Sequence, residues 1–375
     1  MSFFAVLAIV ALFANYYIGI RIYNVIEHFT KKKSRAISLC IGLASYVMLV
    51  AGFIHVILPL SPGVKSVFRY VSAYWMGFFV YFLLYFALAD LVILCSRFFR
   101  KNTAKLRFTS RIAATLLTIC TVVYGLYNAN CIRTQSYTID LENTNDNLRI
   151  VLVSDIHLGA VGSEDRLEDV VAEINKADAD VVCIAGDIFD NDYYAIQNPQ
   201  KAVENLKNIK SKYGVFACPG NHDSGNTTEK MRELLILGNV TLMADSYTKI
   251  GDGFSLAGRD DAHPIGGGFF EGKGRLNVDE ALYGADSSLP IIVMDHNPSN
   301  IDEYQGKADL ILCGHTHRGQ IFPGSIITDL MYDVDYGYYQ KDKESPHVVV
   351  SSGVGTWGIP MRVGTDSEVV VIDIK

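Results

Sequence analysis

Five short motifs in the second half of the chain carry acids, an amide and histidines directly after apolar runs. In chain order they are Asp155-Ile156-His157, Gly186-Asp187, Gly220-Asn221-His222-Asp223, Asp295-His296 and Gly314-His315-Thr316-His317. Carboxylate oxygens, an amide oxygen and imidazole nitrogens together suit borderline divalent ions such as Mn, Fe, Zn, Co or Ni. If the five motifs meet in space, their residue types therefore indicate a metal site.

Two of these motifs repeat the same spacing of ligand types. Residues two apart in an extended segment share a face, so Asp155 and His157 are expected to point the same way, as are His315 and His317. Ordinary turn chemistry is the alternative, because Asn, Asp and Gly favour strand ends anyway. Turn chemistry does not explain four imidazoles at ligand spacing, and we therefore favour the metal site.

The elements that must position these motifs follow from the hydrophobic pattern. Short apolar runs alternate with helical stretches from residue 147 onward, as in a parallel sheet, and 149–154, 164–176 and 180–185 form one βαβ unit. Further strands are expected at 215–218, 240–243, 254–257, 290–294, 310–313, 347–352 and 368–374, with helices at 199–209, 228–237 and 298–304. Ligands of an open α/β sheet bind beyond the carboxyl ends of its strands, where the motifs would converge.

The first part of the chain differs in hydropathy and charge. Four apolar segments, 2–20, 37–58, 71–95 and 112–129, approach or exceed the ~20 residues that a helix needs to cross a bilayer. Residues 1–137 hold 14 of the 33 Lys and Arg but 2 of the 40 Asp and Glu, so the net charge of −7 joins +12 to −19. We expect a transmembrane region over 1–130, a linker over 131–146 and a soluble domain over 147–375. The acidic domain argues against nucleic acid as a partner.

Lys and Arg in the connections predict the orientation of a multi-pass membrane protein. The first and third connections carry five and six of these residues and the second carries two, which places the soluble domain outside the cytoplasm. Asp90 lies in the third span, where an ionisable residue is a candidate for function. Because no basic partner is evident within the spans, we interpret it as an acid near a helix end that is hydrogen-bonded to a neighbouring helix.

In this order and at strand ends, the five motifs resemble those of the calcineurin-like metallophosphoesterase superfamily. The resemblance covers about residues 149 to 375. With the four spans and the ending Ser351-Ser352-Gly353-Val354-Gly355-Thr356-Trp357-Gly358, the chain looks most like the subgroup called transmembrane protein with metallophosphoesterase domain. The resemblance implies a four-layer α/β/β/α sandwich preceded by a bundle of about four transmembrane helices.

The family's ligand scheme implies two divalent metal ions, with Mn favoured. The first ion would be held by Asp155, His157, Asp187 and His317. The second would be held by Asp187, Asn221, His296 and His315, so that Asp187 bridges the two ions. These seven residues are the predicted metal ligands.

Further roles are implied for residues beside the ligands. His222 is implied to be a cation or general acid near the phosphate, with Asp223 as its orienting partner. Arg362 is the predicted contact to the substrate phosphate. Asp295 departs from the family pattern, and an acid beside His296 could raise the basicity of that ligand.

The resemblance implies a membrane-anchored phosphohydrolase that uses a metal-activated hydroxide on a phosphodiester, pyrophosphate or phosphomonoester. Four spans exceed what a soluble substrate requires, which favours a membrane-associated or envelope substrate, and a lipid-linked phosphoester belongs to this class. One alternative is a phosphoprotein or nucleotide phosphoesterase. Another is a non-catalytic receptor or scaffold with a structural metal site. The sequence leaves the oligomeric state open.

Overall fold

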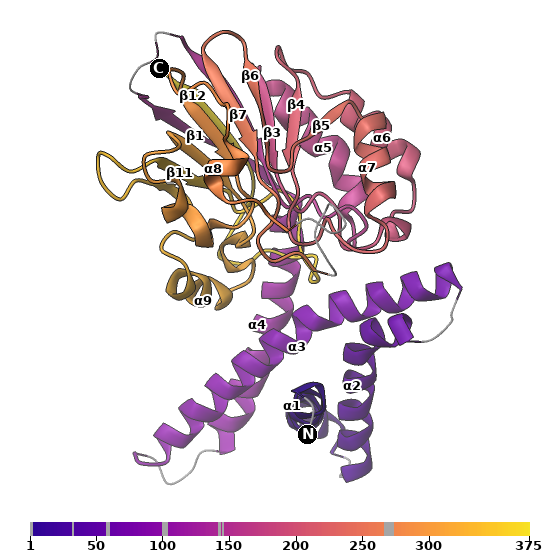
Figure 1. The fold of residues 1–375 in the computed structure, drawn as a ribbon. Helices are drawn as coiled ribbons and strands as arrows, with labels where there is room; N and C mark the ends of the chain where they lie inside the picture. Colours follow the sequence, from indigo (N-terminus) through magenta and orange to yellow (C-terminus); the bar gives the residue numbers. More distant parts are fainter. Residues whose placement is uncertain are drawn as a thin grey trace. The chain divides into compact units, whose positions relative to one another are not determined.

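The computed structural model describes residues 3–31, 34–57, 61–99, 104–141, 144, 146–265 and 274–375. It comprises two compact units (Figure 1). The membrane unit consists of Met1–Tyr127 together with Gly358–Met361, and the α/β unit consists of Asn128–Trp357 together with Arg362–Lys375. A short segment near the end of the chain therefore groups with the N-terminal helices.

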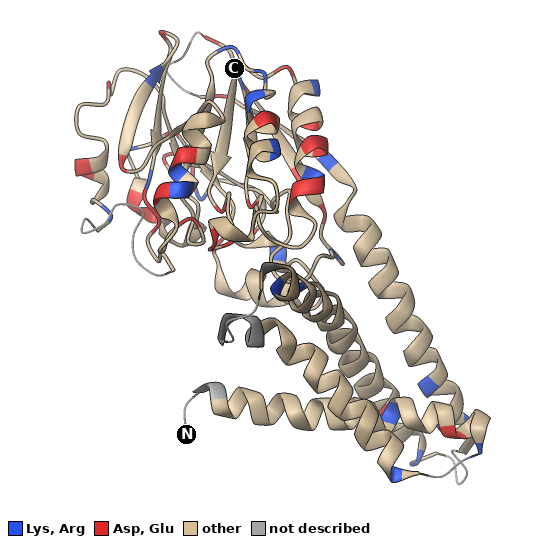
Figure 2. Ribbon diagram, turned by 90° about the vertical axis from the view of Figure 1, so that its right-hand side faces the viewer, with Lys and Arg blue, Asp and Glu red and all other residues tan. Residues whose placement is uncertain are grey.

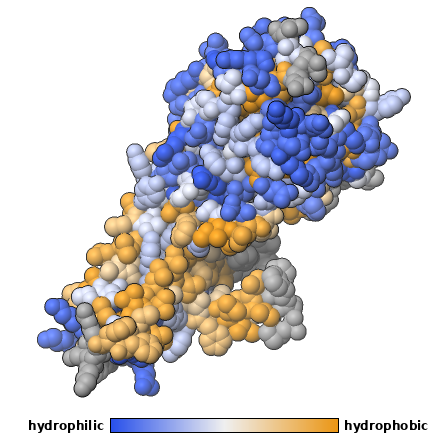
Figure 3. All heavy atoms as spheres, turned by 90° about the vertical axis from the view of Figure 1, so that its left-hand side faces the viewer, coloured by the Kyte–Doolittle hydropathy of each residue, from blue (hydrophilic) through white to orange (hydrophobic). Residues whose placement is uncertain are grey.

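Four long helices form the membrane unit within the described residues: α1 (Phe3–Thr30), α2 (Arg35–Ile57), α3 (Pro62–Ser96) and α4 (Ala104–Ala129). Each contains a stretch long and apolar enough to cross a bilayer, which confirms the prediction of about four membrane helices. Apolar residues dominate their surface in Figure 3, and charged residues are few along them in Figure 2. Residues 2 and 58 of the predicted spans, and cationic residues 32, 33, 100 and 101 of the connections, lie outside the described residues.

Small and polar residues hold α1 against α2. A Cβ on Gly19 would lie 2.6 Å from the backbone nitrogen of Gly42, so the two helices approach closely at these glycines. Nearby, Ser45 donates a hydrogen bond to the Asn15 side chain and accepts one of 3.0 Å from Trp75 Nε1 of α3. Close backbone packing and side-chain hydrogen bonds of this kind are what associate helices in lipid.

Asp90 of α3 is paired with residues of α1. Its Oδ2 accepts hydrogen bonds from Tyr17 Oη at 2.7 Å and from Arg21 Nε at 2.8 Å, and Arg21 Nη2 lies 2.6 Å away. The predicted hydrogen bond to a neighbouring helix is confirmed, but the assumption that no basic partner exists is wrong. Arg21 was placed in a connection because the apolar pattern stops at residue 20, whereas α1 continues to Thr30.

The α/β unit contains two six-stranded sheets with orders β1-β12-β2-β3-β4-β5 and β10-β11-β9-β8-β7-β6. The strands of the first sheet are β1 (Ile132–Ile139), β12 (Ser367–Ile374), β2 (Leu148–Val153), β3 (Val181–Ala185), β4 (Val215–Cys218) and β5 (Val240–Leu242). Those of the second are β10 (Gly337–Tyr339), β11 (His347–Val350), β9 (Leu310–Cys313), β8 (Ile291–Met294), β7 (Phe254–Gly258) and β6 (Ser246–Ile250). Strands β2 to β5 run parallel to one another, as do β7, β8, β9 and β11.

Alternating side chains divide the core into layers. Ile150 and Leu152 of β2 pack in the cluster between the sheets, whereas Val151 and Val153 pack toward helices α5 (Ser163–Lys176), α6 (Pro199–Lys207) and α7 (Thr228–Leu237). On the outer side of the second sheet, Tyr304 of η2 (Pro298–Tyr304) and Val278 of α8 (Val278–Ala281) pack beside β8 and β9. This arrangement is the predicted four-layer α/β/β/α sandwich.

The predicted linker is wrong for residues 132–139, which form β1 and pair in parallel with β12 over the whole strand. Most side chains of β1 are exposed or half-buried, as expected for an edge strand with one open face. The strand lacks a strong apolar signal for that reason, and its partner lies at the other end of the domain sequence. The short strands β6 and β10 and helix α9 (Gly324–Met331) were not predicted either.

We expect Asp90→Ala to lower the unfolding free energy of the membrane unit by about 1 to 3 kcal/mol, because Arg21 then loses its charged partner in a half-buried place. The double variant Asp90→Ala/Arg21→Ala should be more stable than Asp90→Ala alone, since it removes both charges. Thermal unfolding of the full-length protein in detergent measures both effects. Equal midpoints for the single and double variants would contradict the pairing.

Candidate metal centre

Each ligand motif begins within three residues of the end of a strand. Asp155 follows β2, Asp187 follows β3 and Asn221 follows β4 in the first sheet. His296 follows β8 and His315 follows β9 in the second sheet. The motifs therefore extend from the carboxyl ends of strands in both sheets, which face each other across the shared core.

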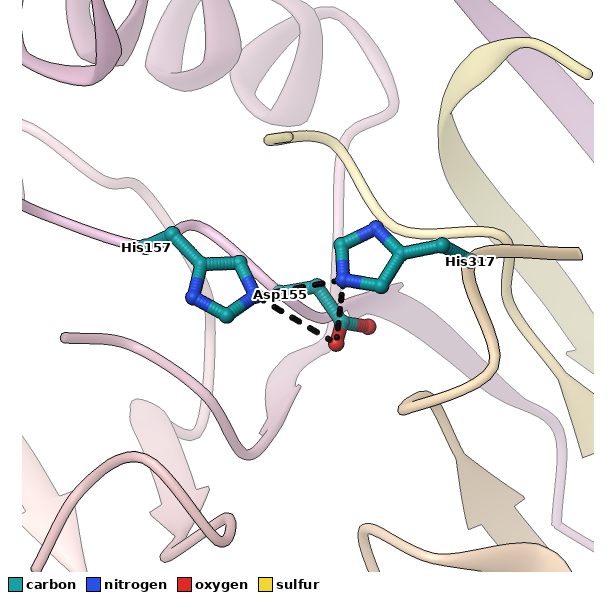
Figure 4. Close-up of side chains that lie close together, drawn as sticks. All are labelled: Asp155, His157 and His317. Carbon is teal, nitrogen blue, oxygen red and sulfur yellow. Dashed lines mark hydrogen bonds and ion pairs between the residues drawn. The ribbon is translucent and has the colours of Figure 1, made fainter. Parts of the chain in front are cut away.

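Asp155, His157 and His317 form one group of side chains (Figure 4). His157 Nε2 and His317 Nε2 lie 3.1 Å apart, and Asp155 Oδ1 lies 4.0 Å from the first nitrogen and 3.3 Å from the second. All three residues are buried. Two neutral imidazole nitrogens at this distance cannot both carry a proton, whereas a cation can accept the lone pairs of both.

Asp187, His296 and His315 form a second group, with Asn221 beside it. His296 Nε2 lies 3.1 Å from Asp187 Oδ2 and 3.3 Å from His315 Nδ1. His315 Nδ1 in turn lies 2.9 Å from Asn221 Oδ1. A carboxylate, an amide and two imidazoles thus converge here, a donor set that fits a borderline divalent ion.

The carboxylate of Asp187 faces both groups. Its Oδ2 lies 3.8 Å from His157 Nε2 of the first group and 3.1 Å from His296 Nε2 of the second. Its Oδ1 accepts the backbone N–H of His222 at 2.8 Å, which fixes the direction of the carboxylate. The structure therefore brings together all seven residues that were predicted as ligands.

The ligands converge through turns and not through extended backbone, so the geometric argument made from the sequence is wrong in its premise. Positive φ angles occur at five ligands: Asp155 (55°), His157 (51°), Asp187 (49°), His315 (73°) and His317 (49°). A non-glycine residue in this region costs of the order of 1–3 kcal/mol. Such strain persists only where surrounding structure holds it, and it concentrates at functional sites.

Glycines let the backbone pass close to the ligand carboxylates. A Cβ on Gly220 would lie 2.3 Å from Asp187 Oδ1, and a Cβ on Gly314 would lie 2.5 Å from Asp155 Oδ2. Any larger residue at these places would displace the carboxylate or the loop that carries it. The glycines of the motifs thus serve the packing of the site.

The two imidazoles of the second group have pKa values shifted in opposite directions. Burial disfavours a proton on His296, but Asp187 at 3.1 Å raises the pKa of this imidazole well above its ordinary value. Burial, and then the charge of His296, lower the pKa of His315 to about 3. A proton on His296 therefore balances the charge of Asp187 and disfavours a second proton on His315. A divalent cation could replace that proton and bind the ring nitrogens of both histidines.

A hydrogen bond orients the imidazole of His296, and a carboxylate lies close behind that of His157. His296 Nδ1 lies 2.8 Å from the carbonyl oxygen of Ala185, and His157 Nδ1 lies 3.6 Å from Asp190 Oδ1. Partners of this kind direct the opposite ring nitrogen toward a metal. Asp190 was missed in the sequence, although its place three residues after Asp187 in the same loop would have put it near the site.

His222 and Asp223 occupy different surroundings. The His222 ring lies 5.2 Å from the His157 ring in an edge arrangement, and the two histidines form a third group with Asp190. Asp223 instead accepts the backbone N–H groups of Phe189 and Gly220, each at 2.8 Å. Its carboxylate shapes the loops of the site, and the prediction that it orients His222 has no hydrogen bond to support it.

Arg362 does not have the predicted position for binding a phosphate. Its side chain is fully buried, and Nη2 donates to the carbonyl oxygens of Ser352 and Gly355 at 2.7 Å each. The same nitrogen lies 3.3 Å from His317 Nδ1. The guanidinium is thus used to hold the C-terminal loop against a ligand, and the prediction of substrate contact is wrong.

Asp295 does not contact the imidazole of His296. It accepts two hydrogen bonds from Arg275, at 3.0 and 2.6 Å, and one of 2.6 Å from Tyr304 Oη. The predicted acid behind the ligand is therefore a partner in a buried ion pair beneath the site. Motif spacing does not predict this pair, because Arg275 belongs to a different loop.

Comparisons with known proteins find a family model and relatives that match the sequence. A family model described as calcineurin-like phosphoesterase matches residues 148–319. The chain is 34% identical over 237 residues to an uncharacterized metallophosphoesterase of Helicobacter pylori, covering 62% of this chain and 60% of that protein. It is 30% identical to an uncharacterized metallophosphoesterase of Bacillus subtilis, covering 61% of this chain and 80% of that protein.

A relative that is named as a transmembrane protein is similar over a longer part of the chain. The chain is 33% identical over 296 residues to a Danio rerio protein named transmembrane protein with metallophosphoesterase domain, covering 75% of this chain and 66% of that protein. The chain thus spans about 60% of the length of the Helicobacter relative and two thirds of the length of the Danio one. With the four apolar helices, this likeness supports a membrane protein.

We expect Gly220→Ala to weaken Mn²⁺ binding about tenfold or more, because the added Cβ displaces the Asp187 carboxylate. Gly274→Ala is the matched control, since a Cβ there meets nothing within 4 Å. Titration of Mn²⁺ into EDTA-treated full-length protein in detergent measures both affinities. Equal binding by the two variants would show that the Gly220 contact is not needed for the site.

Proposed function

The chain belongs to the calcineurin-like phosphoesterase family, and we propose that it is a membrane-anchored, metal-dependent phosphohydrolase with a binuclear site. The observation that carries this proposal is the position of Asp187, whose Oδ2 faces His157 at 3.8 Å and His296 at 3.1 Å. One carboxylate can offer an oxygen to each of two ions held about 3.5–4 Å apart. A structural site for a single ion would not require two groups of ligands.

In the proposed site the two groups hold separate ions. Asp155, His157, Asp187 and His317 would hold the first, and Asp187, Asn221, His296 and His315 the second. When bound, two divalent ions, with Mn²⁺ the favoured one, would polarise the phosphoryl oxygens and supply hydroxide near neutral pH. The protein's part is to fix both ligand sets in a buried place, where the charges act strongly.

His222 is the residue that we assign to the leaving group. Its backbone N–H donates to Asp187 Oδ1, and its ring centroid lies 5.2 Å from that of His157 and 5.9 Å from that of Trp357. Burial lowers the pKa of His222, which the carboxylates of Asp187 and Asp190 partly oppose. A proton or positive charge at this imidazole would favour departure of the alcohol oxygen.

The substrate that we propose is a phosphodiester, pyrophosphate or phosphomonoester at the membrane. Two residues separate the end of α4 at Ala129 from the start of β1 at Ile132, so a short connection joins a membrane helix to the first strand. Trp357 is exposed beside His222 and offers an aromatic surface for an apolar part of the substrate. A phosphoprotein or nucleotide substrate would not make use of the membrane helices.

We expect His222→Ala to lower kcat for bis-p-nitrophenyl phosphate about 10²- to 10⁴-fold while Mn²⁺ binding persists, because His222 is assigned to proton transfer and not to ligation. Asp187→Asn should lose both metal binding and activity, and EDTA should abolish activity of the unchanged protein until Mn²⁺ is restored. The control is His263→Ala, which removes an exposed loop histidine outside the ligand groups.

Full activity of His222→Ala would contradict the role of this residue. Two bound metals without hydrolysis of diester or monoester by the unchanged protein would favour the receptor or scaffold alternative over an enzyme.

The orientation that we propose places the α/β unit outside the cytoplasm. In a chain with Cys40, Cys95, Cys120 and Cys131 replaced by serine, Asp252→Cys should react with a membrane-impermeant maleimide on intact cells. Lys105→Cys, in the cationic connection before the fourth span, should react only after permeabilisation. The reverse pattern of labelling would invert the topology.

A further inference from the structure

Helix α9 (Gly324–Met331) and the residue pair before it present an apolar surface to solvent. Ile326, Ile327, Leu330 and Met331 are 51%, 58%, 80% and 68% exposed, and Phe322 is 45% exposed. No residue of the helix is buried. We call Phe322, Ile326, Ile327, Leu330 and Met331 the α9 patch. Large apolar residues gathered on one exposed element indicate an interaction surface, whereas single ones do not.

The α9 patch is fixed to the candidate metal centre at both ends. Before the helix, a Cβ on Gly319 would lie 2.1 Å from the carbonyl carbon of Gly324, so the His317 turn packs directly on the start of α9. After the helix, the Tyr332 ring lies 6.2 Å from the His315 ring. The helix therefore borders the two histidines of the last ligand motif.

The inner side of α9 is polar and bonded to the domain. Thr328 Oγ1 donates a 2.7 Å hydrogen bond to Asp335 Oδ2, and the Asp335 carbonyl oxygen accepts one of 2.6 Å from Thr316 Oγ1. These bonds turn the polar side of the helix toward the ligand loop and leave its apolar residues outside. The exposure of the α9 patch thus follows from how the helix is anchored.

Hydrogen bonds within the α/β unit join the stretch before α9 to Trp357 and Val363. Gln320 Oε1 accepts the Trp357 N–H at 2.7 Å, its Nε2 donates to the Trp357 carbonyl oxygen at 3.0 Å, and the Phe322 N–H donates to Val363 O at 2.8 Å. Trp357 and Val363 flank Gly358–Met361, which belongs to the membrane unit. Within that unit, a Cβ on Gly77 of α3 would lie 2.6 Å from Met361 Sδ.

We propose that α9 is an interfacial helix whose apolar patch lies in the surface of the lipid bilayer. The chain itself provides four membrane helices, and the residues hydrogen-bonded to the Gln320–Phe322 stretch flank a segment that packs on one of them. An amphipathic helix at a bilayer surface buries its apolar face about 5–10 Å deep. The bilayer is the partner that the chain's own membrane helices imply, and its acyl region matches the chemistry of the patch.

Charge indicates that apolar insertion drives this contact. Residues 322–335 contain Asp329, Asp333 and Asp335 but no Lys or Arg. Attraction to anionic lipids, which basic interfacial helices use, is absent from this stretch. We therefore expect the contact to form equally on phosphatidylcholine and on mixtures with phosphatidylserine.

A lipid-quenching experiment on the full-length chain tests the proposal without any need for catalysis. Leu330→Cys is introduced with Cys40, Cys95, Cys120 and Cys131 changed to serine, while the buried Cys183, Cys218 and Cys313 stay. The new thiol carries an NBD fluorophore, and the protein is placed in phosphatidylcholine nanodiscs with or without doxyl-labelled lipid. Ile236→Cys on α7 is the matched control, since it is also an exposed apolar helix residue, at 64%.

The expected result is a blue-shifted emission at residue 330 that loses most of its intensity to doxyl lipid, and a water-like, unquenched emission at residue 236. Retention of the Mn²⁺ stoichiometry of the unchanged protein shows that the labelled chain is folded. A water-like spectrum at residue 330 would overturn the proposal. A blue-shifted emission without lipid quenching would also overturn it, because the patch would then be covered by protein, such as a second copy of this chain.

The consequence for substrate rests on the proposed function. If α9 brings the metal centre to the bilayer, Leu330→Glu should lower the ratio of activity on a bilayer-embedded phosphodiester to activity on bis-p-nitrophenyl phosphate about tenfold, whereas Ile236→Glu should leave the ratio unchanged. An unaltered ratio for Leu330→Glu would overturn a role of the patch in substrate supply. Lack of hydrolysis by the unchanged protein would refute the proposed function and leave the quenching result to decide the membrane contact.

Discussion

The arrangement of the candidate metal centre depends on how closely the Asp187 carboxylate approaches imidazoles from two sheets. His157 follows β2 of the first sheet and His296 follows β8 of the second, yet Asp187 Oδ2 lies within 4 Å of a nitrogen of each. This distance is set by the apolar layer between the sheets, in which Leu152 and Met294 are both fully buried. The packing of the hydrophobic core therefore determines the distances between the ligands.

The local backbone of the site adds a cost that the rest of the fold must offset. Five ligands adopt positive φ, and Gly220 and Gly314 allow contacts that no side chain would permit. Buried ligands held in this way are organised before a cation arrives, which favours binding. Asp223, Asp295 and Arg362 hold the surrounding loops through the hydrogen bonds of their side chains.

Features that depend on local sequence pattern could be predicted, whereas features that depend on contacts between distant residues could not. The parallel strands and the membrane helices follow from apolar runs, and the convergence of the seven predicted ligands follows from the position of their motifs at strand ends. Strand β1 was not predicted because its mostly exposed side chains give no strong apolar pattern and because its pairing partner, β12, is distant in sequence. The predicted roles of Asp295 and Arg362 were wrong because their partners come from other loops. Asp295 pairs with Arg275, and Arg362 binds the carbonyl oxygens of Ser352 and Gly355.

The most direct test of the central claim is electron paramagnetic resonance of the full-length protein loaded with Mn²⁺. Two ions bridged by Asp187 at about 3.5–4 Å would be exchange-coupled and give a multiline spectrum at two Mn²⁺ per chain. Asp187→Asn should abolish this coupling. A spectrum of isolated Mn²⁺ at full loading of the unchanged protein would contradict the binuclear site.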